Sequence, residues 1–122
     1  MKKRRILVVD DEIYIVHILD FSFQMEGYEV ETALDGEQAL ERVKESRPDL
    51  IVMDTLMPRM DGLDACRAPK ASDETKDIPV VILSPRTRDV DRQMAFEAGA
   101  EDFVTKPFSP RHLVEQVNAI LK

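Results

Sequence analysis

Short apolar runs alternate with longer helical patterns along this chain. Three runs of four apolar residues, at positions 6–9, 50–53 and 80–83, are rich in β-branched side chains. Such uninterrupted runs are typical of parallel strands that are buried on both faces of a sheet. Residues 28–33 alternate polar and apolar side chains, and residues 102–105 form a weaker run. We expect these two segments to be strands nearer the edges of the same sheet.

Helical periodicity fills the stretches between the strands. Apolar residues recur every three or four positions in segments 13–27, 35–47, 90–98 and 109–121, and a further helix is expected to begin near Gly62. The predicted inward faces carry Ile13, Ile15, Val16, Ile18, Leu19 and Phe23 in the first helix, Ala39, Leu40 and Val43 in the second, and Leu113, Val117, Ile120 and Leu121 in the last. Five strands in alternation with five helices predict an α/β fold, a doubly wound (βα)5 domain around a parallel five-stranded sheet.

The length and composition are those of one soluble domain. With 122 residues, of which 43% are hydrophobic and 34% charged, the chain is long enough to bury a core. We expect a single domain over residues 1–122, with no effector domain in this chain. A net charge of −7 disfavours direct binding to nucleic acid. The basic cluster at residues 2–5 is interpreted as a solvated lead-in to the first strand.

Two absences in the sequence favour a cytoplasmic protein. No stretch approaches the roughly 18 consecutive apolar residues that a membrane span requires, so no membrane association is expected. The single cysteine, Cys66, permits no internal disulfide, which fits a reducing compartment.

Polar residues stand directly after the predicted strands. Asp10 and Asp11 follow the first run, Asp54 the third strand, Ser84 the fourth and Lys106 the fifth. If the strands are parallel, these side chains meet at the carboxyl edge of the sheet, where ligands of open α/β sheets bind. Carboxylates gathered in this way raise one another's pKa or recruit a cation. A divalent metal beside a phosphoryl-accepting carboxylate is the interpretation that accounts for the pattern.

Three motifs occur in order on these strand ends. They are Val-Val-Asp-Asp-Glu at residues 8–12, Asp-Thr-Leu-Met-Pro-Arg-Met-Asp-Gly at 54–62, and Lys-Pro-Phe at 106–108. Together they make the chain, from Arg5 to Leu121, resemble the receiver domain of two-component response regulators. The resemblance implies a flavodoxin-like fold with strand order 2-1-3-4-5. It also implies a regulatory phosphoacceptor domain rather than an enzyme, one that catalyses only its own phosphotransfer and dephosphorylation.

The resemblance implies a chemical role for each strand-end residue. Asp54 corresponds to the acceptor that takes a phosphoryl group from a sensor histidine kinase or a phosphotransfer protein, and Lys106 to the lysine that pairs with that group. Asp10 and Asp11 correspond to the acids that hold Mg²⁺, with Asp54 and the backbone carbonyl of Leu56. Oxygen ligands of this kind suit Mg²⁺, and phosphoryl transfer depends mainly on positioning and on neutralising charge.

The same resemblance implies a conformational switch. Ser84 matches the hydroxyl residue that moves toward the phosphoryl group, and Phe103 the aromatic residue whose rotation accompanies the move. The output surface would comprise residues 89–99, 101–105 and 109–121 and would contact an unknown downstream protein. Many DNA-binding members of the family carry an arginine in the last helix that pairs across a dimer. Gln116 stands at that position here, so we expect a monomer or a weak phosphorylation-dependent dimer.

Three prolines bear on this expectation. Pro85 follows the switch hydroxyl, where family members usually carry a small residue whose N–H helps to hold a phosphoryl oxygen; proline has no N–H. Pro69 is expected to end or kink the helix that begins near Gly62, because a proline inside a helix costs about 3 kcal/mol. Residues 70–77 should then form an irregular loop. Pro107 matches a position where the family has a cis Lys-Pro bond.

Several other residues are interpreted as architecture. Glu12 is interpreted as charge in the first turn of a helix, and Asp61-Gly62 as a turn. His17, His112 and Cys66 lack metal-ligand spacing and are interpreted as solvent-facing or packing residues.

Other functions stay open at this point. A degenerate receiver-fold interaction module with weakened switching is favoured by Pro85 alone. A Mg²⁺-dependent phosphohydrolase with Asp54 as nucleophile would need a substrate cap for which this chain has no residues to spare. A flavin-binding domain is disfavoured because Asp10, Asp11 and Glu12 would repel a phosphate unless a cation intervened.

Overall fold

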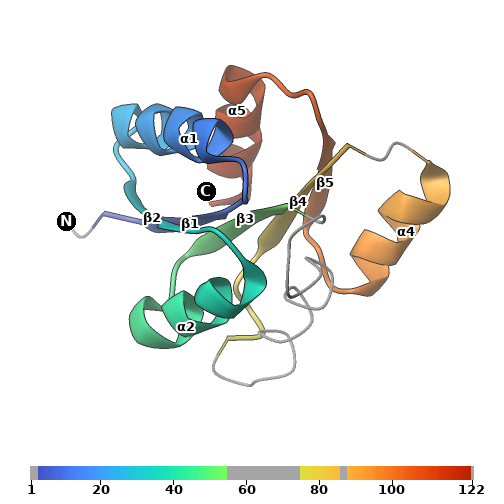
Figure 1. The fold of residues 1–122 in the computed structure, drawn as a ribbon, viewed down its shortest axis with the longest axis horizontal. Coiled ribbons are helices and arrows are strands. Elements are labelled where there is room, and N and C mark those ends of the chain that lie inside the picture. Colours follow the sequence, from blue (N-terminus) through green and yellow to red (C-terminus); the bar gives the residue numbers. More distant parts are fainter. Residues whose placement is uncertain (1–2, 55–74, 86–87, 122) are drawn as a thin grey trace.

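The computed structural model describes residues 3–54, 75–85 and 88–121 (Figure 1). It contains one five-stranded parallel sheet with the order β2-β1-β3-β4-β5, so the predicted fold class and strand order are confirmed. The strands are β1 (Arg5–Val9), β2 (Glu29–Ala33), β3 (Leu50–Asp54), β4 (Val80–Ser84) and β5 (Asp102–Thr105). The two mixed segments, β2 and β5, lie at the two edges as predicted.

Helices cover both faces of the sheet. The described ones are α1 (Ile13–Met25), α2 (Gly36–Ser46), α4 (Asp89–Glu97) and α5 (Pro110–Ile120). Figure 1 shows α1 and α5 side by side on one face and α2 and α4 on the other. The helix expected near Gly62 falls outside the described residues, as do Leu56, Cys66 and Pro69. No helix among the described residues has the length and apolar character that a membrane crossing requires.

The apolar runs form the central layer of two cores. Alternate residues of each strand face opposite sides, because side chains alternate across a strand. Leu7 and Val9 of β1 pack with the helices α2 and α4, whereas Ile6 and Val8 pack with α1 and α5. All four side chains are fully buried. Burying a side chain of this size stabilises the fold by about 1.5–3 kcal/mol, which explains why polar residues are absent from these runs.

The inward face of α1 is narrower than predicted. Ile15, Val16, Leu19 and Phe23 are buried, but Ile13 is 59% exposed and Ile18 44% exposed. At about 100° per residue, Ile13 and Ile18 point away from the centre of the buried stripe, to either side of it. The prediction that these two isoleucines face the core is therefore wrong. In α2 and α5, the predicted inward residues Leu40 and Ile120 are only half-buried.

The helix ends follow from local chemistry. The Asp35 carboxylate accepts a hydrogen bond from the Gln38 N–H (2.8 Å) at the start of α2. Ser109 caps α5 in the same way, accepting from the His112 N–H (3.3 Å), and Pro110 occupies the first turn, as predicted. Such caps satisfy N–H groups that have no partner inside the helix. The Lys106–Pro107 peptide bond is cis, as the resemblance implied.

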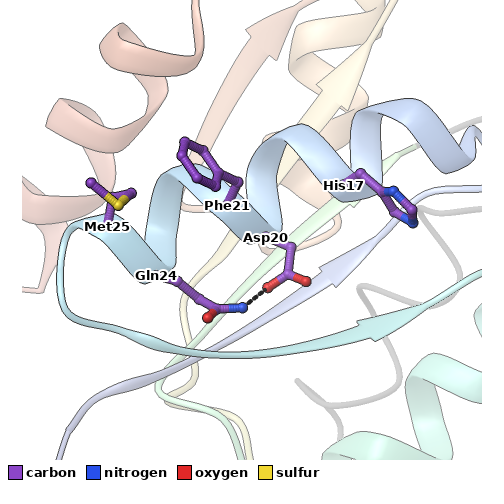
Figure 2. A pocket seen from close by; sticks show the side chains of 5 residues that line it. All are labelled: His17, Asp20, Phe21, Gln24 and Met25. Carbon is purple, nitrogen blue, oxygen red and sulfur yellow. Dashed lines mark hydrogen bonds between the residues drawn. The ribbon is translucent and has the colours of Figure 1, made fainter.

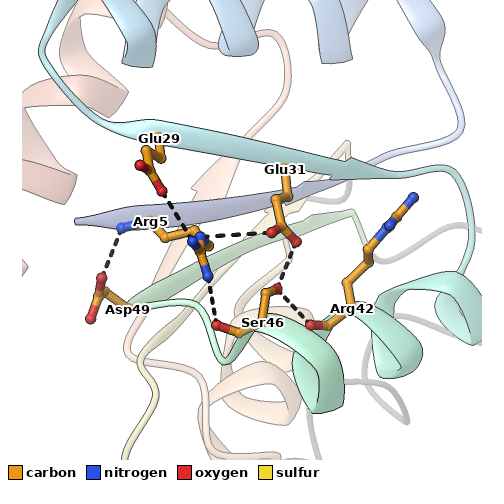
Figure 3. A network of polar contacts seen from close by, with 6 residues as sticks. All are labelled: Arg5, Glu29, Glu31, Arg42, Ser46 and Asp49. Carbon is orange, nitrogen blue, oxygen red and sulfur yellow. Dashed lines mark hydrogen bonds and ion pairs between the residues drawn. The ribbon is translucent and has the colours of Figure 1, made fainter. Parts of the chain in front are cut away.

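Arg5 connects its own strand, β1, to β2, to α2 and to the segment before β3, at the end of the strands opposite the strand-end acids (Figure 3). Its guanidinium donates to the Ser46 carbonyl (2.9 Å) and to Glu29 (3.1 Å) and lies 3.6 Å from Glu31, while its backbone N–H donates to Asp49 (2.7 Å). Arg5 is half-buried and belongs to β1. The interpretation of this residue as a solvated lead-in is therefore wrong.

Candidate functional site

The carboxyl ends of β1, β3, β4 and β5 bring four of the predicted polar residues to one edge. Val9 of β1 pairs with Met53 of β3, so Asp10 and Asp54 follow neighbouring strands. Both carboxylates are buried. At the other side, the Lys106 N–H donates to the Ser84 carbonyl (2.7 Å), which fixes the start of the lysine side chain against β4. The parallel sheet thus positions residues that lie far apart in the sequence.

The Lys106 ammonium lies among three carboxylates. Nζ donates to Asp10 Oδ2 (2.8 Å) and to Glu12 Oε1 (3.1 Å), and it forms an ion pair with Asp54 Oδ2 at 3.5 Å. Three negative groups around one cation leave this end of the sheet with an excess of negative charge. An added cation would be attracted to it.

Both oxygens of Asp10 are engaged. Oδ1 accepts the Glu12 N–H (2.9 Å), and Oδ2 accepts Lys106 Nζ. Burial raises the pKa of the Asp10 carboxyl, and the hydrogen bond from Lys106 opposes that rise. Burial lowers the pKa of Lys106, but the hydrogen bonds to Asp10 and Glu12 raise it by more, so the pKa of Lys106 lies above its ordinary value and the side chain is an ammonium at neutral pH.

Glu12 belongs to the site, although the sequence interpretation treated it as ordinary helix charge. It occupies the N-cap position of α1 but makes no side-chain cap. Instead, Oε1 accepts from Lys106 and Oε2 accepts from the Tyr14 hydroxyl (2.7 Å). The hydrogen bonds from Tyr14 and Lys106 lower the pKa of the Glu12 carboxyl. The only sequence signal for this role was the spacing Asp-x-Glu directly after a strand.

Three acids form a group of the size that a metal ion requires. Among the described residues, Asp10, Glu12 and Asp54 each offer a carboxylate oxygen, and these oxygens lie within 4.8 Å of one another. Asp11, which the resemblance places at the metal, has an exposed side chain and is not in this group. The predicted contribution of Leu56 falls outside the described residues. The donors are all carboxylate oxygens, which match the preference of Mg²⁺ for hard oxygen ligands.

The predicted switch residues lie on the two strands next to the site. Ser84 ends β4 and is buried, and its neighbour Pro85 is exposed. Phe103 on β5 is also buried, and the Arg92 guanidinium of α4 lies over its ring, with Cζ 5.3 Å from the centroid. A cation at this distance is attracted to the ring face. The buried Phe103 ring is thus in contact with α4 through the Arg92 side chain.

Gln116 contacts its own chain. Its Nε2 donates to Asp102 Oδ2 (3.0 Å), which joins α5 to the start of β5. The Gln116 amide is therefore engaged within its own chain.

Comparison with known proteins identifies relatives of this chain. The family model described as the response regulator receiver domain matches residues 6–118. The alkaline phosphatase synthesis transcriptional regulatory protein PhoP of Bacillus subtilis is 40% identical over 119 residues, which are 98% of this chain and 49% of that protein. The chain thus spans about half the length of this curated relative.

Two solved structures extend the likeness to three dimensions. The chemotaxis response regulator CheY4 of Vibrio cholerae matches with a TM-score of 0.93 and 33% identity, over 98% of this chain and 100% of that chain. The receiver domain of the Francisella response regulator 1452 matches with a TM-score of 0.91 and 29% identity, over 98% of this chain and 97% of that chain. Together with the matched family model, these findings show that the chain belongs to the response regulator receiver domain family.

Proposed function

We propose that the chain is a phosphorylation-operated signalling switch in which Asp54 is the phosphoryl acceptor. The observation that carries the proposal is the buried Asp54 carboxylate at the end of β3, 3.5 Å from Lys106 and grouped with two further acids. Receiver domains are regulatory domains that interact with histidine kinases or phosphotransfer proteins. Such a protein is the proposed phosphoryl donor.

The proposed reaction is an in-line transfer. An oxygen of Asp54 attacks the phosphorus of a phosphohistidine, the P–N bond breaks, and the imidazole leaves with its electron pair. Hydrolysis later regenerates the Asp54 carboxylate and releases orthophosphate. Lys106 holds a positive charge beside the acceptor throughout, which is the main contribution that a protein makes to phosphoryl transfer.

The carboxylates at the site fit a divalent cation. The family resemblance implies that Mg²⁺ would be held by Asp10, Asp11 and Asp54 with the backbone carbonyl of Leu56. Glu12 offers a further carboxylate oxygen within 4.8 Å of those of Asp10 and Asp54, whereas the exposed Asp11 lies outside that group. When bound, Mg²⁺ supplies charge that offsets the negative charge of the transferring group. Asp10 and Lys106 keep the site ordered, because each is a hydrogen-bond partner of the other.

The proposed output passes from Ser84 and Phe103 to the surface formed by α4, β5 and α5. Arg92 supports this route because it joins α4 to the Phe103 ring. Pro85 lacks the N–H that would hold a phosphoryl oxygen, so we propose that the Ser84 response is weaker than in relatives with a small residue there. Pro85 also favours the second candidate, a receiver-fold interaction module that is not phosphorylated.

The outer face of α1 is the proposed contact surface for the phosphodonor protein. An exposed stripe, hereafter the outer stripe, consists of Tyr14, Ile18, Phe21 and Met25 at helical spacing. Figure 2 shows Phe21 and Met25 on one side of α1 and the polar His17, Asp20 and Gln24 beside them. The outer stripe is continuous with the site, because the Tyr14 hydroxyl donates to Glu12. Exposed apolar surface of this kind marks protein contacts.

The remaining expectations stand as parts of the same proposal. We propose a cytoplasmic, single receiver domain over residues 1–122 that is monomeric or weakly dimeric, with a downstream protein rather than nucleic acid as its partner. Gln116, in place of the arginine that pairs across the dimer in many DNA-binding relatives, supports a weak dimer at most, and its amide is engaged within its own chain.

One experiment separates the two candidate functions. The protein is incubated with Mg²⁺ and acetyl phosphate, and intact mass is measured for the wild type and for Asp54→Asn. We expect the wild type to gain the mass of one phosphoryl group and Asp54→Asn to gain none. No mass gain in the wild type would contradict the proposed function and favour the unphosphorylated module.

A further inference from the structure

We propose that Glu12 is a positioning residue that holds Lys106 in the unphosphorylated state and releases it when Asp54 is phosphorylated. The inference rests on the proposed function of Asp54 as acceptor. It assigns to Glu12, and through it to Tyr14, a part in setting how readily the site accepts a phosphoryl group.

The backbone places the Glu12 side chain at the site. Its N–H donates to Asp10 Oδ1 (2.9 Å), and its carbonyl accepts from the N–H groups of Ile15 (3.0 Å) and Val16 (3.2 Å). The residue is thus fixed between the end of β1 and the start of α1. Because its side chain makes no cap, the carboxylate is available to reach across to Lys106.

Glu12 occupies a donor that a phosphoryl group would use. Lys106 has three N–H donors, and Nζ lies closer to Glu12 (3.1 Å) than to Asp54 (3.5 Å). A phosphoryl group on Asp54 brings additional negative charge and acceptor oxygens to the same ammonium. The Glu12 carboxylate carries charge of the same sign as that group. Pairing of Lys106 with the phosphoryl group therefore displaces Glu12.

Burial decides which partner Lys106 gives up. The Asp10 side chain is completely buried, so losing Lys106 would leave a buried charge without compensation. The Glu12 side chain is 41% exposed, so water can replace the ammonium there. Lys106 consequently keeps Asp10 and exchanges Glu12 for the phosphoryl group.

Tyr14 connects this exchange to the surface. Its hydroxyl orients the Glu12 carboxylate through the 2.7 Å hydrogen bond, and its ring is the first member of the exposed outer stripe. A phosphodonor protein that covers the outer stripe therefore touches the residue that orients Glu12. Loss of the hydroxyl should weaken the hold of Glu12 on Lys106 without removing its charge.

The kinetic test measures phosphorylation by acetyl phosphate at saturating Mg²⁺. A partly exposed ion pair stabilises the unphosphorylated state only slightly, so we expect its loss in Glu12→Gln to accelerate phosphorylation by only about threefold to fivefold. Glu41→Gln, which removes an exposed acid from α2, is the matched control and should react like the wild type. Tyr14→Phe should give a smaller acceleration, and adding it to Glu12→Gln should give no further change, because both act through one contact.

A second readout does not depend on phosphorylation. The NMR signal of the Lys106 ammonium reports its hydrogen bonds in the unmodified protein, and we expect Glu12→Gln to shift it and to speed its exchange with water, whereas Glu41→Gln leaves it unchanged. If the wild type is phosphorylated but Glu12→Gln reacts at the wild-type rate, the inference is overturned while the proposed function stands. An unchanged ammonium signal in Glu12→Gln would also overturn it. A wild type that takes up no phosphoryl group would overturn the proposed function itself.

Discussion

Lys106→Met should reduce the stability of the protein strongly. The substitution removes the ammonium but keeps a flexible side chain of similar length. The buried Asp10 carboxylate loses its hydrogen bond from Lys106 and keeps the one from the Glu12 N–H. Asp54 loses its ion pair with Lys106 at 3.5 Å. Removing one member of a buried ion pair costs about 3–5 kcal/mol. We expect the free energy of unfolding at pH 7 to fall by about this amount.

Urea unfolding followed by circular dichroism measures the effect. With a slope of roughly 2 kcal/mol per molar urea, the midpoint should fall by about 1.5–2.5 M. Lys44→Met on the exposed side of α2 is the control and should change the free energy of unfolding by no more than about 0.5 kcal/mol. Millimolar Mg²⁺ should restore part of the loss, because a ligand of the folded state stabilises it.

The pH dependence of this variant has a definite sign. Asp10 without Lys106 is ionised at a greater cost, so its pKa rises further above the ordinary 3.8. A carboxyl whose pKa is raised in the folded state binds protons more tightly there than in the unfolded chain, so its effect on stability becomes less favourable as pH rises through that window. The deficit of Lys106→Met should therefore shrink as the pH is lowered toward 4. A loss below about 1 kcal/mol at pH 7 would refute this account of the Asp10–Lys106 pair.

Three further predictions concern the metal, the switch and the fold. Burial raises the pKa of Asp10 above the ordinary 3.8, so Asp10 takes up a proton, and the affinity for Mg²⁺ falls, at a higher pH than an ordinary aspartate would cause. Calorimetric titration at a series of pH values measures this. An Asp10→Asn variant with the same pH profile as the wild type would contradict it. Pro85→Ala restores an N–H worth on the order of 1.5–3 kcal/mol to a phosphoryl oxygen. It should therefore enlarge the beryllofluoride-induced NMR shifts in α4, β5 and α5. Shifts equal to those of the wild type would contradict the proposal that Pro85 weakens the Ser84 response. Asp35→Ala removes the cap of α2 and should cost about 1 kcal/mol by thermal unfolding, whereas an unchanged midpoint would show that the cap bond to Gln38 is not stabilising.

The sheet could be predicted because its signal is local. Each central strand is buried on both faces, so each requires a continuous run of apolar residues, and such a run is visible in four consecutive letters. The polar residue that follows each run then lies at one edge, since parallel strands share their carboxyl ends. The sequence alone therefore predicts that Asp10, Asp54 and Lys106 meet at this edge.

The missed features depend on contacts between distant residues. Glu12 and Lys106 are separated by 94 positions, and Arg5 and Ser46 by 41, so no local pattern contains either contact. The prediction of which α1 residues face the core was partly wrong for a related reason. Apolar residues occur on two of its sides, and periodicity alone does not show which of Ile13, Ile18 or Phe23 turns toward the sheet. Packing against β1 and α5 makes that choice.

The most direct test of the central claim locates the phosphoryl group. The protein is phosphorylated with acetyl phosphate and Mg²⁺, and then treated with borohydride, which reduces an acyl phosphate to an alcohol. Peptide mass spectrometry shows which residue has been converted. We expect reduction at position 54 in the wild type and none without the phosphodonor. Reduction at another acid such as Asp10 or Glu12, or at no residue in a protein that has gained phosphoryl mass, would contradict the assignment of Asp54 as the acceptor.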